Sequence, residues 1–242
     1  MKLALLAVGS LIVARESFAK CAMQELAPAL VTPKNAAIPA DGGVLVGFQY
    51  SRDDEVQPAK GDPSMTAAWT WSQTMTKENL APGLTVYKPK SAAAITVKDG
   101  KKLLGTFTRD PKAAAAGSAV PRIGKLEITT HPARRGRHRE ATVTSTDPIP
   151  NDAFGAIVYV ERGGKSVPIA FGTIDHHDPK SRTFIAYADP SRCAFAPPGT
   201  EPPPVKGKVT IAWFDRFGRV SKQSAPVEVT EVPPPAGLSD DD

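Results

Sequence analysis

Runs in which apolar and polar residues alternate recur along the chain, and a period of two is typical of β-strands. The clearest run is residues 208–213, KVTIAW, in which every second side chain is strongly apolar. Residues 215–218, DRFG, supply a turn signal, and apolar alternation resumes at Val227. We therefore predict an antiparallel hairpin over residues 206–229 that closes a small β-domain.

The same period predicts short strands in both halves of the chain. A pair Asp-Gly at 99–100 and a pair Gly-Gly at 163–164 lie between apolar runs and signal tight hairpins. Residues 75–82 are interpreted as a connector and residues 131–139 as a basic turn. The predicted strands are 36–43 (a short edge strand with a turn), 44–50, 66–72, 83–88, 94–97, 102–108, 123–130, 140–145, 156–161, 166–171 and 183–187.

A change of composition divides the chain in two. Residues 111–120, PKAAAAGSAV, are Ala-rich and bracketed by Pro and Gly, which indicates a linker. It separates a domain over residues 20–110 from one over 121–232, and residues 233–242 form an acidic tail that we expect to be disordered. The second domain has about seven predicted strands, the number typical of an immunoglobulin-like sandwich. We therefore predict an all-β protein of two tandem β-sandwich domains.

Residues 1–19 have the pattern of a secretory signal peptide. Lys2 precedes an uncharged apolar run over 3–13, and residues 17–19, SFA, fit a cleavage site. The run is shorter than the roughly 20 residues of a spanning helix, although an uncleaved anchor or a plain first helix remains an alternative. Cleavage removes two positive charges and one negative charge, which changes the net charge from +5 to +4. We predict a secreted, periplasmic or cell-envelope protein with no transmembrane segment after cleavage and no nucleic-acid partner.

The chain has two cysteines, Cys21 and Cys193. An even number in an oxidising compartment favours one disulfide. The pairing could form within one chain or between two. A lipidated Cys21 is an alternative, against which Lys20 and Phe18 argue.

The second domain resembles a fibronectin type III or immunoglobulin-like domain. The resemblance is carried by residues 209–229, VTIAWFDRFGRVSKQSAPVEV, with Trp213 and the closing strand SAPV. The first domain resembles such a domain more weakly, through residues 38–44, IPADGGV. The usual inter-sheet cysteine pair of these domains is absent. The chain is similar to exported bacterial proteins built from such domains, and the resemblance implies a recognition or spacer role.

Four arginines lie close together in the predicted basic turn. They are Arg134, Arg135, Arg137 and Arg139. Guanidinium groups bind carboxylates and phosphates through paired hydrogen bonds, so this segment is a candidate site for lipid phosphates, an acidic polysaccharide or an acidic protein surface. The alternative is a solvated turn whose charges aid solubility.

Two further candidates are a metal site and a sugar site. Trp69 and Trp71 share one face of a predicted strand, where they form either a stacking platform for sugars or part of the core. Imidazole and carboxylate ligands for a metal such as Zn²⁺ occur together at Asp175, His176, His177 and Asp178, with His131 or His138 as possible additions. The alternative for this tetrad is a polar turn.

No motif for a nucleophile elbow, a zinc protease or a phosphate-binding loop is present. We therefore predict a non-enzymatic protein without a cofactor. Its function would be binding or scaffolding in the cell envelope or outside the cell, through loops at a sandwich end, with an unknown protein or polysaccharide as partner. Alternatives are a carbohydrate-binding module that uses Trp69 and Trp71, and a metal-dependent hydrolase around His176 and His177.

Overall fold

The computed structural model describes residues 28–48, 69–112, 119–133, 136–174, 182–188 and 199–233. These residues form strands and loops and contain no helix. The prediction of an all-β protein is therefore confirmed. The predicted signal peptide at 1–19 lies outside the described residues, as do most of the predicted linker and nearly all of the predicted tail.

The first half of the chain forms two four-stranded sheets. Their strand orders are β1-β3-β6-β5 and β2-β8-β7-β4, and all neighbours are antiparallel except β2 and β8. A core lies between the sheets, where Val44 of one sheet packs with Ile95 and Phe107 of the other. The strands are β1 (Pro28–Leu30), β2 (Ala37–Pro39), β3 (Val44–Phe48), β4 (Trp69–Trp71), β5 (Met75–Ala81), β6 (Leu84–Pro89), β7 (Ile95–Asp99) and β8 (Lys102–Asp110).

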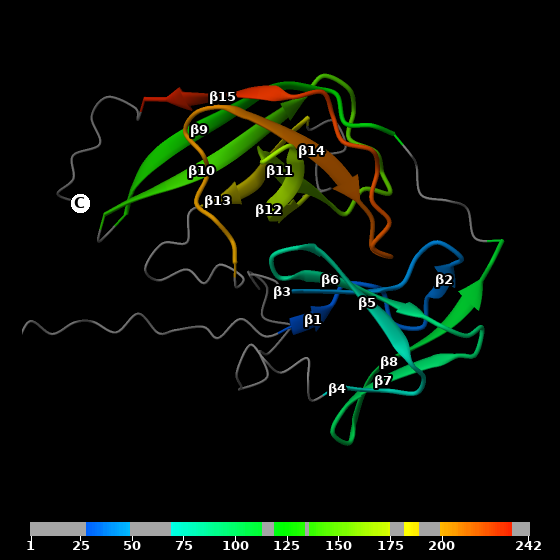
Figure 1. Ribbon diagram of the computed structural model, residues 1–242. Coiled ribbons are helices and arrows are strands. Elements are labelled where there is room, and N and C mark those ends of the chain that lie inside the picture. The colour runs from blue at the N-terminus through cyan, green and yellow to red at the C-terminus, as the bar shows by residue number, and fades with distance from the viewer. Residues whose placement is uncertain are drawn as a thin grey trace, which may run out of the picture.

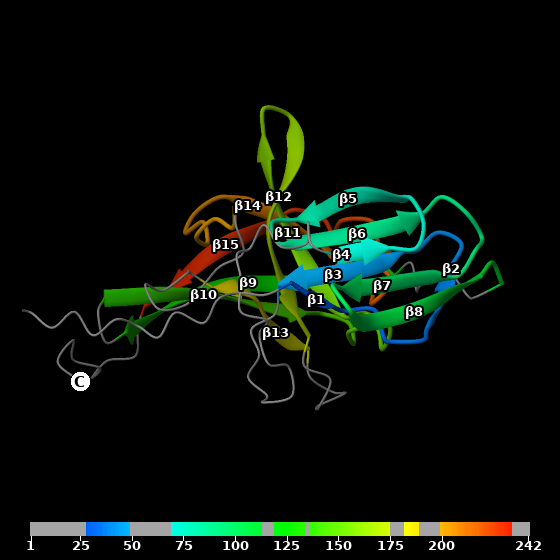
Figure 2. The same cartoon turned by 90° about the horizontal axis from the view of Figure 1, so that it is seen from below.

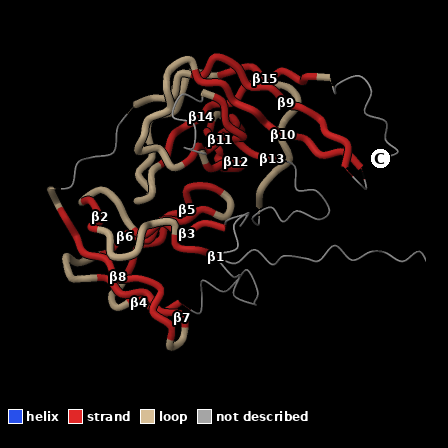
Figure 3. Tube along the Cα trace, turned by 180° about the vertical axis from the view of Figure 1, so that it is seen from behind, coloured by secondary structure: helices blue, strands red, loops and turns tan. Residues whose placement is uncertain are grey.

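The second half forms one seven-stranded sheet in the order β12-β11-β14-β15-β9-β10-β13. The sheet curls, so that its two edge strands approach each other where Gly172 of β12 meets the backbone of Ala186 of β13. Figures 1 and 3 show this half packed against the first half. The strands are β9 (Ile123–Ala133), β10 (Gly136–Ser145), β11 (Gly155–Arg162), β12 (Lys165–Thr173), β13 (Thr183–Ala188), β14 (Lys208–Phe214) and β15 (Val227–Val232).

Strands β11 and β14 are covered on both faces. On β11, Ala156 and Val158 point into the core of the second half, whereas Ile157 belongs to a separate core cluster that includes Leu45 and Leu84 of the first half. Alternate side chains of one strand therefore enter two different cores. The two halves share buried apolar surface, which the alternation of β14 alone did not indicate.

Several local predictions are confirmed and others are wrong. The hairpins at 99–100 and 163–164 form, and all three of their glycines have positive φ. The predicted connector 75–82 is wrong, because β5 occupies most of it as a polar edge strand. The predicted basic turn 131–139 is wrong as well: β9 and β10 run through it and leave only residues 134–135 between them.

The predicted hairpin 206–229 forms only in part. Strands β14 and β15 pair at two positions, Lys208↔Glu228 and Val209↔Val227. Between them, the hydroxyl oxygens of Ser221 and Ser224 accept hydrogen bonds from the β14 backbone in place of a regular ladder. Beyond Glu228, β15 pairs with β9 in parallel orientation. Proline and polar residues in the returning segment favour this irregular path over a continuous strand.

Candidate functional site

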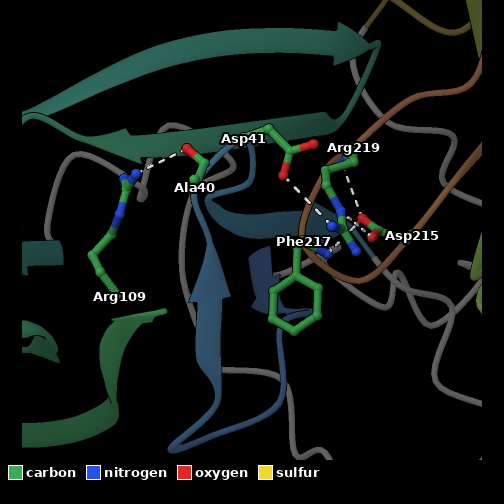
Figure 4. A network of polar contacts seen from close by, with 6 residues as sticks. All are labelled: Ala40, Asp41, Arg109, Asp215, Phe217 and Arg219. Atoms are coloured by element: carbon green, nitrogen blue, oxygen red, sulfur yellow. Dashed lines mark hydrogen bonds and ion pairs between the residues drawn. The ribbon is translucent and has the colours of Figure 1, made fainter. Parts of the chain in front are cut away.

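The turn after β14 is organised by a buried ion pair. Asp215 Oδ1 accepts hydrogen bonds from the backbone N–H of Phe217 and of Arg219, both at 2.9 Å. Asp215 Oδ2 accepts a hydrogen bond from Arg219 Nε at 2.7 Å. The side chains of Asp215 and Arg219 are only 6% and 11% exposed. The carboxylate thus holds both the turn backbone and the guanidinium, as Figure 4 shows.

This turn inserts into the first half of the chain. The carbonyl oxygen of Phe217 accepts a hydrogen bond from Gly43 N at 2.8 Å, and the carbonyl oxygen of Arg216 accepts one from Thr32 Oγ1 at 2.6 Å. Arg219 Nη1 lies 3.5 Å from Asp41 Oδ1 across the junction (Figure 4). Gly218 has φ of 70°, and a Cβ there would lie 2.6 Å from Val86 Cγ2. The turn is therefore fitted closely to its partner surface.

Aromatic side chains complete the junction. Phe214 is almost fully buried and makes edge-to-face contacts with Phe154 and Phe171, whose ring centroids lie 5.9 Å and 6.0 Å away. Tyr159 packs against the same cluster, and burial raises the pKa of its phenol to about 12. The shared apolar cluster and the inserted turn together join the two halves into one body.

The strands β9 and β10 extend beyond the sheet as a two-stranded ribbon. β15 pairs with β9 only as far as Val232↔Thr129, and β13 pairs with β10 only as far as Ala188↔Glu140. β9 and β10 pair with each other for four further positions, from Thr130↔Arg139 to Ala133↔Gly136. In the part of the chain that the structure describes, no third strand flanks these positions. We call residues 130–139 the basic arm, and the ends of β9 and β10 that form it lie on the left of Figures 1 and 2.

The basic arm carries all four arginines of the predicted anion site. Its sequence, THPARRGRHR, contains four arginines, two histidines and no acidic residue. Arg137 and Arg139 both belong to β10. Arg134 and Arg135 lie between the described strand ends, outside the described residues. An acidic side chain borders the arm at its base, where Glu140 Oε2 lies 3.6 Å from His131 Nε2.

Trp69 and Trp71 are partly buried on β4, an edge strand of the first half. Both side chains pack against the cluster that contains Ile95 and Val97. The ring of Trp71 also stacks on Tyr87, with centroids 4.6 Å apart and an interplanar angle of 25°. These contacts favour a packing role for the two tryptophans over a sugar-stacking platform.

The structure does not describe the residues of the predicted metal site or of the predicted disulfide. Residues 175–178, Cys21 and Cys193 all lie outside the described residues. Two histidines were named as possible additional ligands, and the backbone register pairs their positions, His131 of β9 and His138 of β10. Within the described ranges, no group of three or more His, Cys, Asp or Glu side chains is arranged to hold a metal ion.

The sequence analysis did not single out Asp215 and Arg219. An aspartate followed three residues later by glycine is a turn signal, and it could have indicated that the carboxylate binds the turn backbone. Its pairing with Arg219 and with the first half depends on tertiary contacts that no local pattern reveals.

Comparison of the chain with protein-family models, with curated proteins and with solved structures found no match. The described residues include no helix that is long and apolar enough to cross a membrane.

Proposed function

We propose that this protein is an exported, non-enzymatic binding protein of the cell envelope or extracellular space, which engages an anionic partner through the basic arm. The observation that carries the proposal is the β9–β10 register, which continues past the last partners of both strands. Among the described residues, no third strand pairs with either edge of this ribbon. The core of the second half supports the proposal, because buried residues of β9 and β10 such as Ile128 and Ala141 anchor the arm in it.

An acidic polysaccharide fits the composition of the arm better than a membrane or a protein. Residues 129–140, TTHPARRGRHRE, contain no large aliphatic or aromatic side chain. Membrane-surface segments insert such side chains among the lipids, and protein interfaces place them at their centre. A line of guanidinium groups with no apolar anchor instead suits repeated carboxylates along a flexible, hydrated polymer.

We expect the full-length protein to bind alginate oligomers, a linear polyuronate, with an affinity that falls as salt is raised. The triple substitution Arg134→Ser/Arg135→Ser/Arg137→Ser should weaken this binding at least tenfold, because it removes three of the four guanidinium groups of the arm. Arg139 is kept, since it is partly buried. Affinity is measured by titration calorimetry at two salt concentrations.

A matched control removes the same charge at a different hairpin. Lys98, Lys101 and Lys102 are exposed on the β7–β8 hairpin, and Lys98→Ser/Lys101→Ser/Lys102→Ser should change alginate affinity less than twofold. Equal losses in the two triple variants would show a net-charge effect and refute the arm as the site. Absence of alginate binding by the unsubstituted protein, or binding only to vesicles of phosphatidylglycerol and phosphatidylcholine, would refute the polysaccharide proposal.

A further inference from the structure

We propose that the end of the β7–β8 hairpin, residues 98–103, docks on the surface of a lipid bilayer that contains anionic phospholipids. We call these residues the lysine tip. Their sequence, KDGKKL, contains three lysines, one aspartate and one leucine. Figures 1 and 3 show the end of this hairpin at the bottom of the picture, on the side of the first half that faces away from the second half. The inference concerns a different surface from the basic arm and does not rest on the proposed function.

The lysine tip carries an apolar side chain that the fold does not bury. Leu103 is 55% exposed, the largest exposed fraction among the exposed large apolar side chains of the described residues. Its neighbour Leu104 packs against the core cluster that contains Ile95 and Val97, which Leu103 does not join. Folding therefore buries part of one leucine and leaves the other in contact with solvent.

A β-bulge determines which of the two leucines is on the solvent face. The register of the hairpin shifts between Val97 and Lys98, and Lys98 pairs with Leu103, so that Leu104 is the extra residue of β8. Directly paired residues of an antiparallel ladder have side chains on the same face. Leu103 therefore shares a face with Lys98 and with Thr70 of β4, and all three are exposed, whereas Val97 on the opposite face is fully buried.

The three lysines lie around this leucine. Lys98 is its cross-strand partner, Lys102 directly precedes it, and Lys101 lies in the turn of the hairpin. All three lysines are exposed, and none of them forms an ion pair with another described residue. An apolar side chain among unpaired cations is typical of segments that lie on anionic membranes, because the ammonium groups stay at the lipid phosphates while the apolar group enters the acyl layer.

A lipid surface suits the lysine tip better than a protein or a polysaccharide. The tip offers six residues at the end of one hairpin, whereas a stable protein interface uses about 20–30 residues on each side. A hydrated polysaccharide has no hydrocarbon layer in which the leucine would be buried. An anionic bilayer provides phosphates and hydrocarbon next to each other, which matches the lysines and the leucine together.

The test measures binding of the full-length protein to vesicles of phosphatidylglycerol and phosphatidylcholine by cosedimentation in 0.15 M NaCl. We expect binding to these vesicles and none to vesicles of phosphatidylcholine alone. Lys98→Ser/Lys101→Ser/Lys102→Ser should lower the partition coefficient at least about thirtyfold, because each lysine near an anionic surface contributes a factor of about five. Leu103→Ser should lower it about tenfold, because the apolar group no longer enters the acyl layer.

Matched controls remove the same groups elsewhere. Lys77→Ser/Lys90→Ser/Lys112→Ser removes three exposed lysines from other parts of the first half, and Val120→Ser removes an exposed apolar side chain outside the tip. Each control should change the partition coefficient less than threefold. Equal losses in the two lysine variants would show a net-charge effect, and unchanged binding by Leu103→Ser would show that no apolar group enters the lipid. Either result would overturn the inference.

Alginate titrations separate this inference from the proposed function. Vesicle binding that depends on the lysine tip, together with no alginate binding, would uphold the inference and refute the proposed function. Alginate binding without vesicle binding would do the reverse. A loss of alginate affinity of more than tenfold in the lysine-tip variant would assign the tip to the polymer and overturn its assignment to lipid.

Discussion

Replacing Gly172 by alanine should lower the free energy of unfolding by about 3 kcal/mol or more. A Cβ at this position would lie 2.7 Å from the carbonyl carbon of Ala186 and nearer still to the carbonyl oxygens of Ile185 and Ala186. These are backbone atoms of β13, so the clash cannot be relieved by a side-chain rotation. Thermal unfolding followed by circular dichroism should show a decrease of about 10 °C in the midpoint.

Gly164→Ala is the matched control on the same hairpin. Gly164 has φ of 73°, but a Cβ there would meet no atom within 4 Å. Gly164→Ala should therefore lower the free energy of unfolding by only about 1 kcal/mol, the cost of placing a non-glycine residue in the left-handed backbone conformation. Equal destabilisation by the two substitutions would contradict the close approach of β12 and β13 that curls the second sheet.

Asp215→Ala should be comparably disruptive. The substitution removes three hydrogen-bond acceptor contacts at once and leaves Arg219 as a buried cation without its main partner. Breaking one side of a buried ion pair costs about 3–5 kcal/mol. Because the turn is inserted into the first half, we also expect the single unfolding transition of the unsubstituted protein to separate into two in the variant. Differential scanning calorimetry measures both effects.

Two further variants show whether the junction is responsible. Asp215→Asn retains an oxygen that accepts from the turn backbone and should be destabilised less than Asp215→Ala. Glu201→Ala breaks the ion pair between Glu201 and Arg162, which is solvent-exposed, and should change stability little. If Asp215→Ala unfolds like Glu201→Ala, or if the unsubstituted protein already shows two transitions, the two halves are not one cooperative body.

Local chemistry allowed much of the fold to be predicted from the sequence. Asp-Gly at 99–100 and Gly-Gly at 163–164 specify tight turns by the positive φ that glycine permits, and both hairpins form. The alternation of apolar and polar residues identified strands such as β14. Residues 75–82 were missed because β5 is an exposed edge strand, in which four consecutive residues are solvated and no apolar period develops.

Long-range contacts account for the rest. The parallel pairing of β15 with β9 joins segments about a hundred residues apart, and nothing near Val229 signals it. Likewise, the arm was interpreted as a turn because its sequence, THPARRGRHR, has no alternation of apolar and polar residues that would reveal its strands. The candidate arginines were predicted from charge alone. The position of Arg137 and Arg139 in the part of the β9–β10 ladder that continues past β13 and β15 became clear only from the strand register.

The measurement that tests the proposed function most directly is hydrogen–deuterium exchange of the full-length protein with and without saturating alginate oligomers. We predict that protection on binding is concentrated in peptides that span the basic arm, residues 130–139, whose described strand positions pair only with each other among the described residues. Protection concentrated instead around Trp69 and Trp71 would contradict the account and favour a sugar-stacking site. Absence of protection anywhere would show that the protein does not bind this class of polymer.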